Sequence, residues 1–496
     1  MSLKKFICSL ILTALVLGLV LSFMISLNLG NPSSYVPAKA DTSTNTKTDN
    51  TNIANINLNT SLPHGGYGRI MAEYAPDSTG IWQRSSISDL PAYVDLMRRL
   101  AEVSPLATKL DEGSILFTDN SFSLRSFAIN TSKTYTEAGD ALPAPLYSTP
   151  SLTATCMFTG DLMCLKGQQF AAGVKSSYDF WPMYKYVAPI FSTADFVCGN
   201  LESLLSESNP ITKNQVNAAN GQPQCNGPKI YLNALRKAGF DMLVTANNHT
   251  CDWGATGITE TKTHLEEFGF ANTGTHFFED PAGEEEDRFV IFDVNGIKLA
   301  ILSYTHIINQ RGYLNATQMD RMVHLFDREK VKADIDSARE KGADFVAVYC
   351  HWGIENTETL NSYQLNDSKF LVESGVDLII GSHPHCLQRC EYIESESGKK
   401  VLCMYSMGNF CSSMVRDINN DTIILKVTLK KNVSQNETTM TSASYIPCHA
   451  MTKDGHSFVV VPTSSDLNGG YKSSVLDSAK ARIDKIMNNV IPCCED

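Results

Sequence analysis

The stretch Ala246-Asn247-Asn248-His249-Thr250-Cys251-Asp252-Trp253-Gly254 lies between two segments of different character. An apolar run at 240–245 precedes it and predicts a buried strand, and residues 255–268 predict a helix. An amide and an imidazole therefore lie where a strand gives way to a helix, which is where open α/β sheets place ligand sites. An Asn oxygen can bind a metal while the adjacent His acts on a substrate. Taken alone, the pair also fits simple loop hydrogen bonding.

Four other predicted strand ends carry side chains of the same kind. They are Asp161 after residues 153–158, Glu202 after 195–198, His351 after 345–349, and His383 with His385 after 376–380. Carboxylates, an amide and imidazoles without a thiolate suit Mn, Fe, Zn or Mg. Each residue alone has a structural alternative, such as a helix cap for Asp161 or a core position for His351. Together they predict a metal centre.

Composition and charge limit the class of protein. The chain has 496 residues, of which 43% are hydrophobic and 19% charged, so it is globular and longer than one ordinary domain. Its formal net charge of −12 argues against a nucleic-acid partner. An acidic protein that acts on an anionic substrate needs a local positive charge, which a metal would supply.

The N-terminal segment predicts a membrane anchor. Lys4 and Lys5 precede an uncharged apolar run at 6–29, which is long enough to span a bilayer. The lysines stay on the cytoplasmic side, so the body lies outside the cell on a single membrane pass. Ala38-Lys39-Ala40 resembles a signal-peptidase site, so secretion after cleavage near Ala40 remains open.

The chain divides into five predicted segments. They are 1–30, an anchor or signal peptide; 31–62, a polar disordered linker; 63–152, an accessory region; 153–414, the catalytic body; and 415–496, strands and a helix that complete the body. In the body, strands alternate with helices, one of them expected at 182–191, and Asn295-Gly296 predicts a hairpin. This pattern predicts a layered α/β fold with a mixed sheet.

The cysteines give an ambiguous signal. There are 14, and 13 follow the apolar start, an odd number that excludes complete internal pairing. Several lie within apolar strand-like runs, where Cys behaves as a small hydrophobic residue. We therefore expect most to be reduced core residues, with Cys386/Cys390 and Cys493/Cys494 as the exceptions.

Six motifs bring a known family to mind. In order they are Phe158-Thr159-Gly160-Asp161, Gly199-Asn200-Leu201-Glu202, residues 247–254, His351-Trp352-Gly353-Ile354-Glu355, residues 381–385 and residues 405–410. Over about residues 153–414 the chain resembles the bacterial capsule synthesis protein CapA/PgsA family, which serves poly-γ-glutamate synthesis. That family is similar to the calcineurin-like metallophosphoesterases. The resemblance implies layered mixed β sheets flanked by helices, behind an N-terminal membrane segment.

The resemblance also implies roles for single residues. Asp161 and His385 would bind a first metal, Asn248, His351 and His383 a second, and Glu202, or in its place Asn200, would bridge them. His249 would protonate a leaving group. Substrate contacts would come from Asn200, Asp252, Glu355 and Asn409. The residue pattern by itself predicts instead that Asp252 caps the helix that begins near Ala255.

One position departs from the phosphoesterase pattern. A histidine is expected two residues after the first aspartate, where this chain has Met163. A thioether is a poor ligand for a hard or borderline cation. We therefore expect one firm metal, with a second conditional on substrate.

Three functions remain open from the sequence. The first is an enzyme at the outer face of the membrane that cleaves a phosphoester or a γ-glutamyl amide of an anionic polymer. The second is a non-catalytic metal-binding factor that assembles or exports the polymer with other capsule synthesis membrane proteins. The third is a secreted metal-dependent phosphatase or nucleotidase.

Overall fold

The computed structural model describes residues 74–76, 80–84, 108–110, 114–116, 151–174, 177–214, 223–279, 287–451, 458–471 and 473–494. The chain divides into two compact units, one of Met1–Gly66 with Ser86–Leu142 and one of Tyr67–Ser85 with Pro143–Asp496. Within the first unit, β3 (Thr108–Leu110) pairs antiparallel with β4 (Ser114–Leu116). All features below belong to the second unit.

The predicted membrane anchor at 6–29, the polar linker and most of the accessory region lie outside the described residues. Among the helices of the described ranges, none combines the length and the apolar character that crossing a membrane requires. The five predicted segment boundaries therefore stay predictions.

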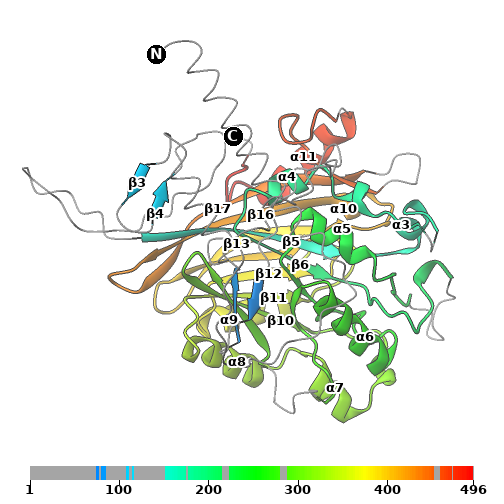
Figure 1. The fold of residues 1–496 in the computed structure, drawn as a ribbon, viewed down its shortest axis with the longest axis horizontal. Coiled ribbons are helices and arrows are strands. Elements are labelled where there is room, and N and C mark those ends of the chain that lie inside the picture. Colours follow the sequence, from blue (N-terminus) through cyan, green and yellow to red (C-terminus); the bar gives the residue numbers. More distant parts are fainter. Residues whose placement is uncertain are drawn as a thin grey trace, which may run out of the picture. The chain divides into compact units, whose positions relative to one another are not determined.

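Two sheets form the second unit (Figure 1). The first has the order β1-β2-β9-β10-β11-β12-β14-β13. Its strands are β1 (Tyr74–Pro76), β2 (Ile81–Arg84), β9 (Phe289–Val294), β10 (Ile297–Thr305), β11 (Phe345–His351), β12 (Leu378–Ser382), β14 (Lys400–Met407) and β13 (Leu387–Glu394).

The second sheet has the order β18-β17-β16-β5-β6-β7-β8, and β15 pairs with β5 beside this path. Its strands are β18 (Val459–Pro462), β17 (Glu437–Met451), β16 (Asp421–Asn432), β5 (Ser151–Leu162), β6 (Phe196–Leu201), β7 (Met242–Val244), β8 (Ala271–Thr273) and β15 (Asn409–Cys411). Because β16 pairs with β5, the C-terminal strands belong to the same sheet as the predicted ligand Asp161 at the end of β5.

Alternating side chains along β5 explain why the two sheets pack face to face. Cys156 and Phe158 belong to the core cluster shared with the first sheet, and the Phe158 ring lies 6.3 Å from that of Tyr349. Met157, between them in sequence, belongs to the cluster on the opposite face. A strand with a period of two can bury both faces in this way only when another layer covers each face.

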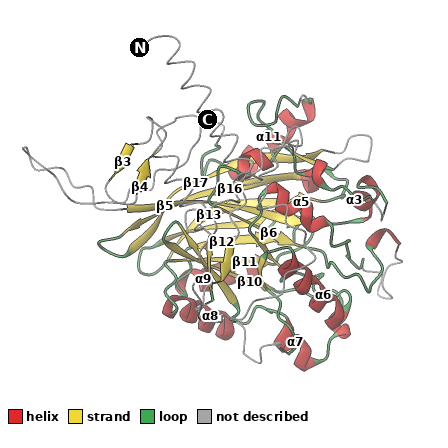
Figure 2. Ribbon diagram, viewed as in Figure 1, coloured by secondary structure: helices red, strands yellow, loops and turns green. Residues whose placement is uncertain are grey.

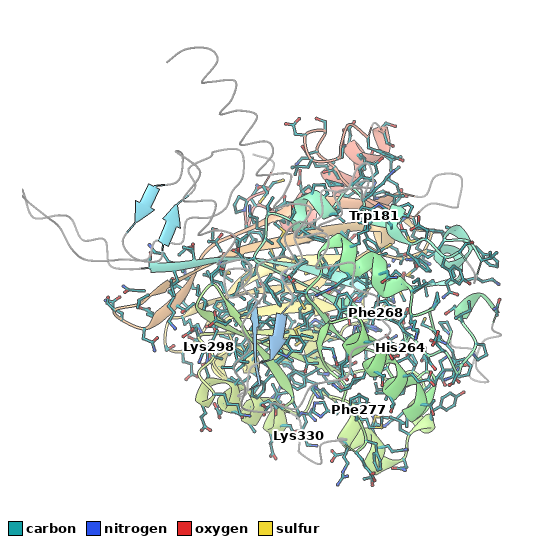
Figure 3. The ribbon with its side chains drawn as sticks, viewed as in Figure 1. Trp181, His264, Phe268, Phe277, Lys298 and Lys330 are labelled. Carbon is teal, nitrogen blue, oxygen red and sulfur yellow. The ribbon has the colours of Figure 1, made fainter. Side chains whose placement is uncertain are left out.

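Helices supply the outer layers, so Figure 2 shows strands between helices. On the first sheet, α8 (Arg328–Glu340) packs Val331 and Ile335 into the outer cluster, which also contains Leu371 of α9 (Ser362–Glu373). Lys330 lies on the outer side of α8, where its Nζ is 2.5 Å from Asp320 Oδ1 (Figure 3).

On the second sheet, α4 (Ala188–Phe191) and α5 (Tyr231–Ala238) cover the outer face. The other described helices are α3 (Lys166–Ala171), α6 (Gly254–Glu267), α7 (Ala316–Met322), α10 (Asp417–Asn420) and α11 (Ser474–Met487). The predicted layered α/β fold with a mixed sheet is confirmed.

Of two local predictions, the hairpin is confirmed and one helix is wrong. Asn295 and Gly296, at φ 55° and 81°, join β9 to β10 as the predicted hairpin turn. The helix predicted at 182–191 is wrong, because the structure has a 3₁₀ turn at Trp181–Met183 and the separate short helix α4. Each of these two elements has a proline in its first turn, and a proline is excluded from the interior of one continuous helix.

None of the described cysteines, from Cys156 to Cys494, forms a disulfide, and most are buried. The prediction of reduced core cysteines is therefore confirmed. Cys386 and Cys390 form no disulfide, and neither do Cys493 and Cys494, so the prediction that these two pairs are exceptions is wrong.

Parallel pairing brings the predicted functional residues to one region. β5, β6 and β7 run parallel in one sheet, and β11 and β12 run parallel in the other. Asp161 is in register with Asn200, and His351 is in register with Ser382. The carboxyl ends of five strands thus face a common space, as expected for ligand sites in open sheets.

Gly381 lets the backbone of β12 pack tightly against the neighbouring strand β14 beneath this region. A Cβ at this position would lie 1.9 Å from the carbonyl oxygen of Tyr405 and 2.7 Å from Nε1 of Trp352. We expect Gly381→Ala to lower the free energy of unfolding by at least about 3 kcal/mol, because the obstructing atom belongs to the backbone. Gly312→Ala, with open space around the new methyl group, is the matched control. Equal urea midpoints for the two variants would contradict this account of β12.

Candidate metal centre

The six predicted metal ligands are buried together. No side chain in the set is more than 4% exposed. They are Asp161 at the end of β5, Glu202 after β6, Asn248 after β7, His351 at the end of β11, and His383 and His385 after β12. The strand ends that the sequence singled out therefore do converge.

Glu202 belongs to two groups of potential ligands. One group is Asp161, Glu202 and His385, the other is Glu202, His351 and His383, and within each group one ligand atom per residue lies within 4.8 Å of the others. Glu202 Oε1 is 3.6 Å from His351 Nε2 and 3.7 Å from His385 Nε2. The geometry thus offers two adjacent cation positions that share one carboxylate.

The donors present fit a divalent cation. Both carboxylate oxygens of Glu202 are buried and accept no hydrogen bond from any described residue. A carboxylate buried without donors is costly, and the ion pairs that the described residues give Glu202 are with the imidazoles of His351 and His385. Oxygen and imidazole ligands of this kind suit Mn, Fe, Zn or Mg.

Burial favours the uncharged forms of both acids and of two of the histidines. A bound cation would reverse this effect for the acids. Burial raises the pKa of Asp161, and burial together with the Asp161 charge raises the pKa of Glu202 well above its ordinary value. Burial and the neighbouring histidines hold the pKa of His351 well below the usual range and lower that of His383 to about 3. The imidazoles of His351 and His383 are therefore neutral, which is the form that binds metals.

Polar neighbours orient the ligands. Asn200 Nδ2 donates to Asp161 Oδ1 at 2.7 Å, and Ser382 Oγ lies 2.8 Å from His351 Nδ1. Asn200 is engaged with Asp161, whereas Glu202 Oε1 lies near both His351 and His385, so the geometry favours Glu202 for the shared position. The substrate contact predicted for Asn200 stays a prediction.

Asn409 holds His385 in a defined tautomer. His385 Nδ1 lies 2.8 Å from Asn409 Oδ1, an acceptor, so Nδ1 carries the hydrogen and Nε2 is directed to Glu202. Such hydrogen bonds behind a ligating imidazole orient the ring and raise its basicity. Asn409 is fully buried, and its predicted contact with substrate is untested by this geometry.

The His383-Pro384-His385 turn has an unusual backbone. Both histidines have positive φ, 95° for His383 and 56° for His385, which costs energy in residues other than glycine. Hydrogen bonds hold the turn, since Pro384 O accepts from the Asn356 amide at 2.8 Å and His385 O accepts from Asn419 Nδ2 at 2.9 Å. Two imidazoles therefore point into one small region.

His249 lies in a chain of hydrogen bonds beside this region. Its Nδ1 is 2.6 Å from Asp252 Oδ2, and its Nε2 is 3.7 Å from Cys225 Sγ. Burial lowers the pKa of His249, but Cys225 and Asp252 raise it by more, so it lies well above the ordinary value. A protonated imidazole suits the predicted role of proton donor.

Asp252 does not cap the following helix. The N-cap of α6 is Trp253, without a side-chain cap bond, while Asp252 Oδ2 accepts from the Cys225 amide at 2.6 Å and pairs with His249. The capping prediction is wrong because the buried imidazole and amide supply stronger partners than the helix end. The predicted substrate contact of Asp252 stays a prediction.

Three further residues that the sequence analysis named are Asn248, Glu355 and Met163. Asn248 Oδ1 lies 3.0 Å from His351 Nε2, beside the second cation position, and its predicted role as a ligand stays a prediction. Glu355 is exposed and outside the ligand groups, and its substrate contact stays a prediction. Met163 is buried, and among histidines and acids the first position has the three donors Asp161, Glu202 and His385.

The sequence did not single out Cys225. It lies between residues 223 and 230, which form neither helix nor strand, and no apolar run ends beside it. The only local signal was its position in the polar segment before α5, which many surface loops share. Its place beside His249 depends on a contact 24 residues along the chain.

Comparison with known proteins identifies the family of the chain. Residues 155–414, more than half of the chain, match the family described as "Bacterial capsule synthesis protein PGA_cap". The chain is similar to the PGA biosynthesis protein CapA of Bacillus subtilis (strain 168), with 29% identity over 287 residues, 58% of this chain and 70% of that protein. It is also similar to the capsule biosynthesis protein CapA of Bacillus anthracis, with 26% identity over 298 residues, 58% and 67% of the two chains.

Solved structures give weaker likenesses. The NAD nucleotidase NadN of Haemophilus influenzae has a TM-score of 0.38 and 9% identity, over 67% of this chain and 56% of that chain. The calcineurin-like phosphoesterase YfkN of Bacillus subtilis has a TM-score of 0.34 and 12% identity, over 68% and 98%. Nothing about the site rests on them.

Glu202→Gln tests whether the shared carboxylate serves a cation. We expect the metal-free variant to be at least as stable as wild type, because a buried amide costs less than a buried carboxylate without donors. Addition of Mn²⁺ should raise the melting temperature of the wild type but of the variant only at concentrations more than about tenfold higher. Glu355→Gln, at an exposed acid, is the control. The same Mn²⁺ dependence in Glu202→Gln and wild type would exclude a bridging role.

Proposed function

Because the chain belongs to the bacterial capsule synthesis protein family PGA_cap, we propose that it serves poly-γ-glutamate capsule synthesis through a metal-dependent hydrolase site. The site is the buried centre around Glu202. The substrate class is a phosphoester or a γ-glutamyl amide of the anionic polymer. The protein would act outside the cell, anchored by the apolar run at 6–29 or secreted after cleavage near Ala40.

One observation carries the hydrolase proposal. Glu202 is common to two ligand groups, and both its oxygens lack a hydrogen-bond donor among the residues described. A bound divalent cation would polarise a phosphoryl or acyl oxygen and lower the pKa of a bound water. It would also offset repulsion between a protein of net charge −12 and an anionic polymer.

The chain's own residues would supply the remaining chemistry. His249, held by Asp252 through Nδ1, keeps a proton on its other nitrogen and can donate it to the departing oxygen or nitrogen. Asn248 Nδ2 is buried and has no partner within the described part, so it is free to bind an anionic oxygen of the substrate. Asn200, Ser382 and Asn409 keep the ligands in place.

A specific observation favours a second candidate, a non-catalytic factor that binds the polymer for assembly or export. The ligands are at most 4% exposed, so a polymer reaches them only after the surrounding loops move. The first cation position also lacks a ligand from Met163. In this version the cation stabilises the fold while other membrane proteins of capsule synthesis perform the chemistry.

Two histidine variants separate the candidates. If the site is catalytic, His249→Ala should lower kcat by about 10²–10⁴-fold with unchanged Mn²⁺ binding at the centre around Glu202, because a general acid is lost. His383→Ala should lose metal as well as activity. The assays are hydrolysis of a generic phosphodiester and of a γ-glutamyl amide with Mn²⁺, together with polymer production in cells that carry each variant.

His264→Ala is the control, because His264 pairs with Glu267 on α6 and belongs to neither ligand group. Polymer production kept in His249→Ala but lost in His383→Ala, with no hydrolysis by the wild type, would favour the non-catalytic factor. Polymer production kept in His383→Ala would reject both versions.

A further inference from the structure

A third group of potential ligands lies beside the centre and shares no residue with it. Cys225, His249 and Asp252 each offer one ligand atom within 4.8 Å of the others, and none of the three is more than 3% exposed. The backbone fixes the cysteine, since its amide donates to Asp252 Oδ2 at 2.6 Å and its carbonyl accepts from the Leu204 amide at 3.2 Å. This group contains a thiol, which the two groups around Glu202 do not.

The distance between sulfur and nitrogen suits a zinc ion. Cys225 Sγ lies 3.7 Å from His249 Nε2. In a tetrahedral site with Zn–S of about 2.3 Å and Zn–N of about 2.0 Å, sulfur and nitrogen are about 3.5 Å apart. A zinc ion could therefore bind both atoms after a shift of only a few tenths of an ångström.

The other nitrogen of His249 has the partner that zinc-binding histidines usually have. Its Nδ1 is 2.6 Å from Asp252 Oδ2. A histidine that binds a metal through one nitrogen commonly donates its other N–H to a carboxylate, which fixes the ring. This arrangement leaves Nε2 directed to the thiol of Cys225.

The charges of the group also suit a cation. Asp252 lies on the Nδ1 side of the ring, so it orients His249 and is not itself a ligand of an ion bound at Nε2. A thiolate and a carboxylate together balance the charge of one divalent ion, which would displace the protons that the group otherwise holds. A sulfur ligand favours Zn²⁺ over Mg²⁺ or Mn²⁺, which prefer oxygen.

We propose that Cys225 and His249, with Asp252 holding the ring of His249, form a separate zinc site, and that zinc bound there occupies His249 Nε2 and inhibits the protein. The existence of the site depends only on these three residues. Its inhibitory effect rests on the proposed function, in which His249 donates a proton from the same nitrogen.

Cobalt can report the site, because thiolate bound to Co²⁺ absorbs strongly in the near ultraviolet and oxygen or imidazole ligands do not. The full-length protein is first saturated with Mg²⁺ and then titrated with Co²⁺. We expect the absorption to saturate at one equivalent of cobalt and to disappear when Zn²⁺ is added. Absence of this absorption in the wild type would overturn the proposal.

Variants locate the sulfur and the carboxylate. Cys225→Ser and Cys225→Ala should lose the absorption, while Cys251→Ser, a buried thiol two residues from His249 and outside the group, should keep it. Absorption that persists in both Cys225 variants would overturn the site. Asp252→Asn should keep the absorption but bind Co²⁺ roughly 10–100-fold more weakly. Unchanged affinity would overturn the assignment of Asp252. Thermal melts show that each variant is folded.

Inhibition is measured separately. With Mn²⁺ present, zinc should reduce hydrolysis by the wild type, and inhibition of Cys225→Ser, relative to its own zinc-free rate, should require at least tenfold more zinc. Equal zinc sensitivity would overturn the inhibitory effect. If the wild type shows no hydrolysis, the proposed function fails, while the cobalt absorption still decides whether the zinc site exists.

Discussion

The structure depends on a carboxylate that is buried without a hydrogen-bond donor. Glu202 has no exposed surface, and His351 and His385 approach its Oε1 from two sides. Burial of such a group opposes folding unless it is protonated or a cation is bound. The raised pKa of Glu202 is the consequence in the absence of a cation.

The two sheets contribute different chemistry to this centre. The acids Asp161 and Glu202 follow strands of the sheet that contains β5, whereas His351, His383 and His385 follow strands of the sheet that contains β11. The apolar core between the sheets therefore sets the distance between carboxylates and imidazoles. The close backbone approaches at Gly160 and Gly381 help to keep this distance, because a side chain at either position would separate the strands.

His249 links the shared centre to the group that contains Cys225. Through Nδ1 it is bound to Asp252, and its Nε2 faces a thiol. His249 Nε2 can therefore hold either a proton, which the enzymatic role needs, or a thiophilic cation, which would block that role. Asp252 supports both states, since a carboxylate behind an imidazole orients it whether the other nitrogen binds hydrogen or a metal.

The sequence by itself determined the strand ends that carry the ligands, the Asn295-Gly296 turn and the alternation of strands and helices. These follow from local patterns: apolar runs of strand length, a turn pair suited to positive φ, and polar residues directly after each run. For the same reason it could place Asp161, Glu202, Asn248, His351, His383 and His385 in one region. It favoured Glu202 for the shared position but left Asn200, two residues earlier, as an alternative.

Only the tertiary structure decided which partners these residues have. Asp252 pairs with His249 and the Cys225 amide and does not cap α6, Asn409 orients His385, and Cys386 and Cys390 form no disulfide. Each outcome depends on the orientation of side chains from segments that pack together only in the folded chain. Local periodicity encodes which face of a strand or helix is buried, but the distance from Cys225 Sγ to His249 Nε2 arises only when the loops around β6 and β7 pack against each other.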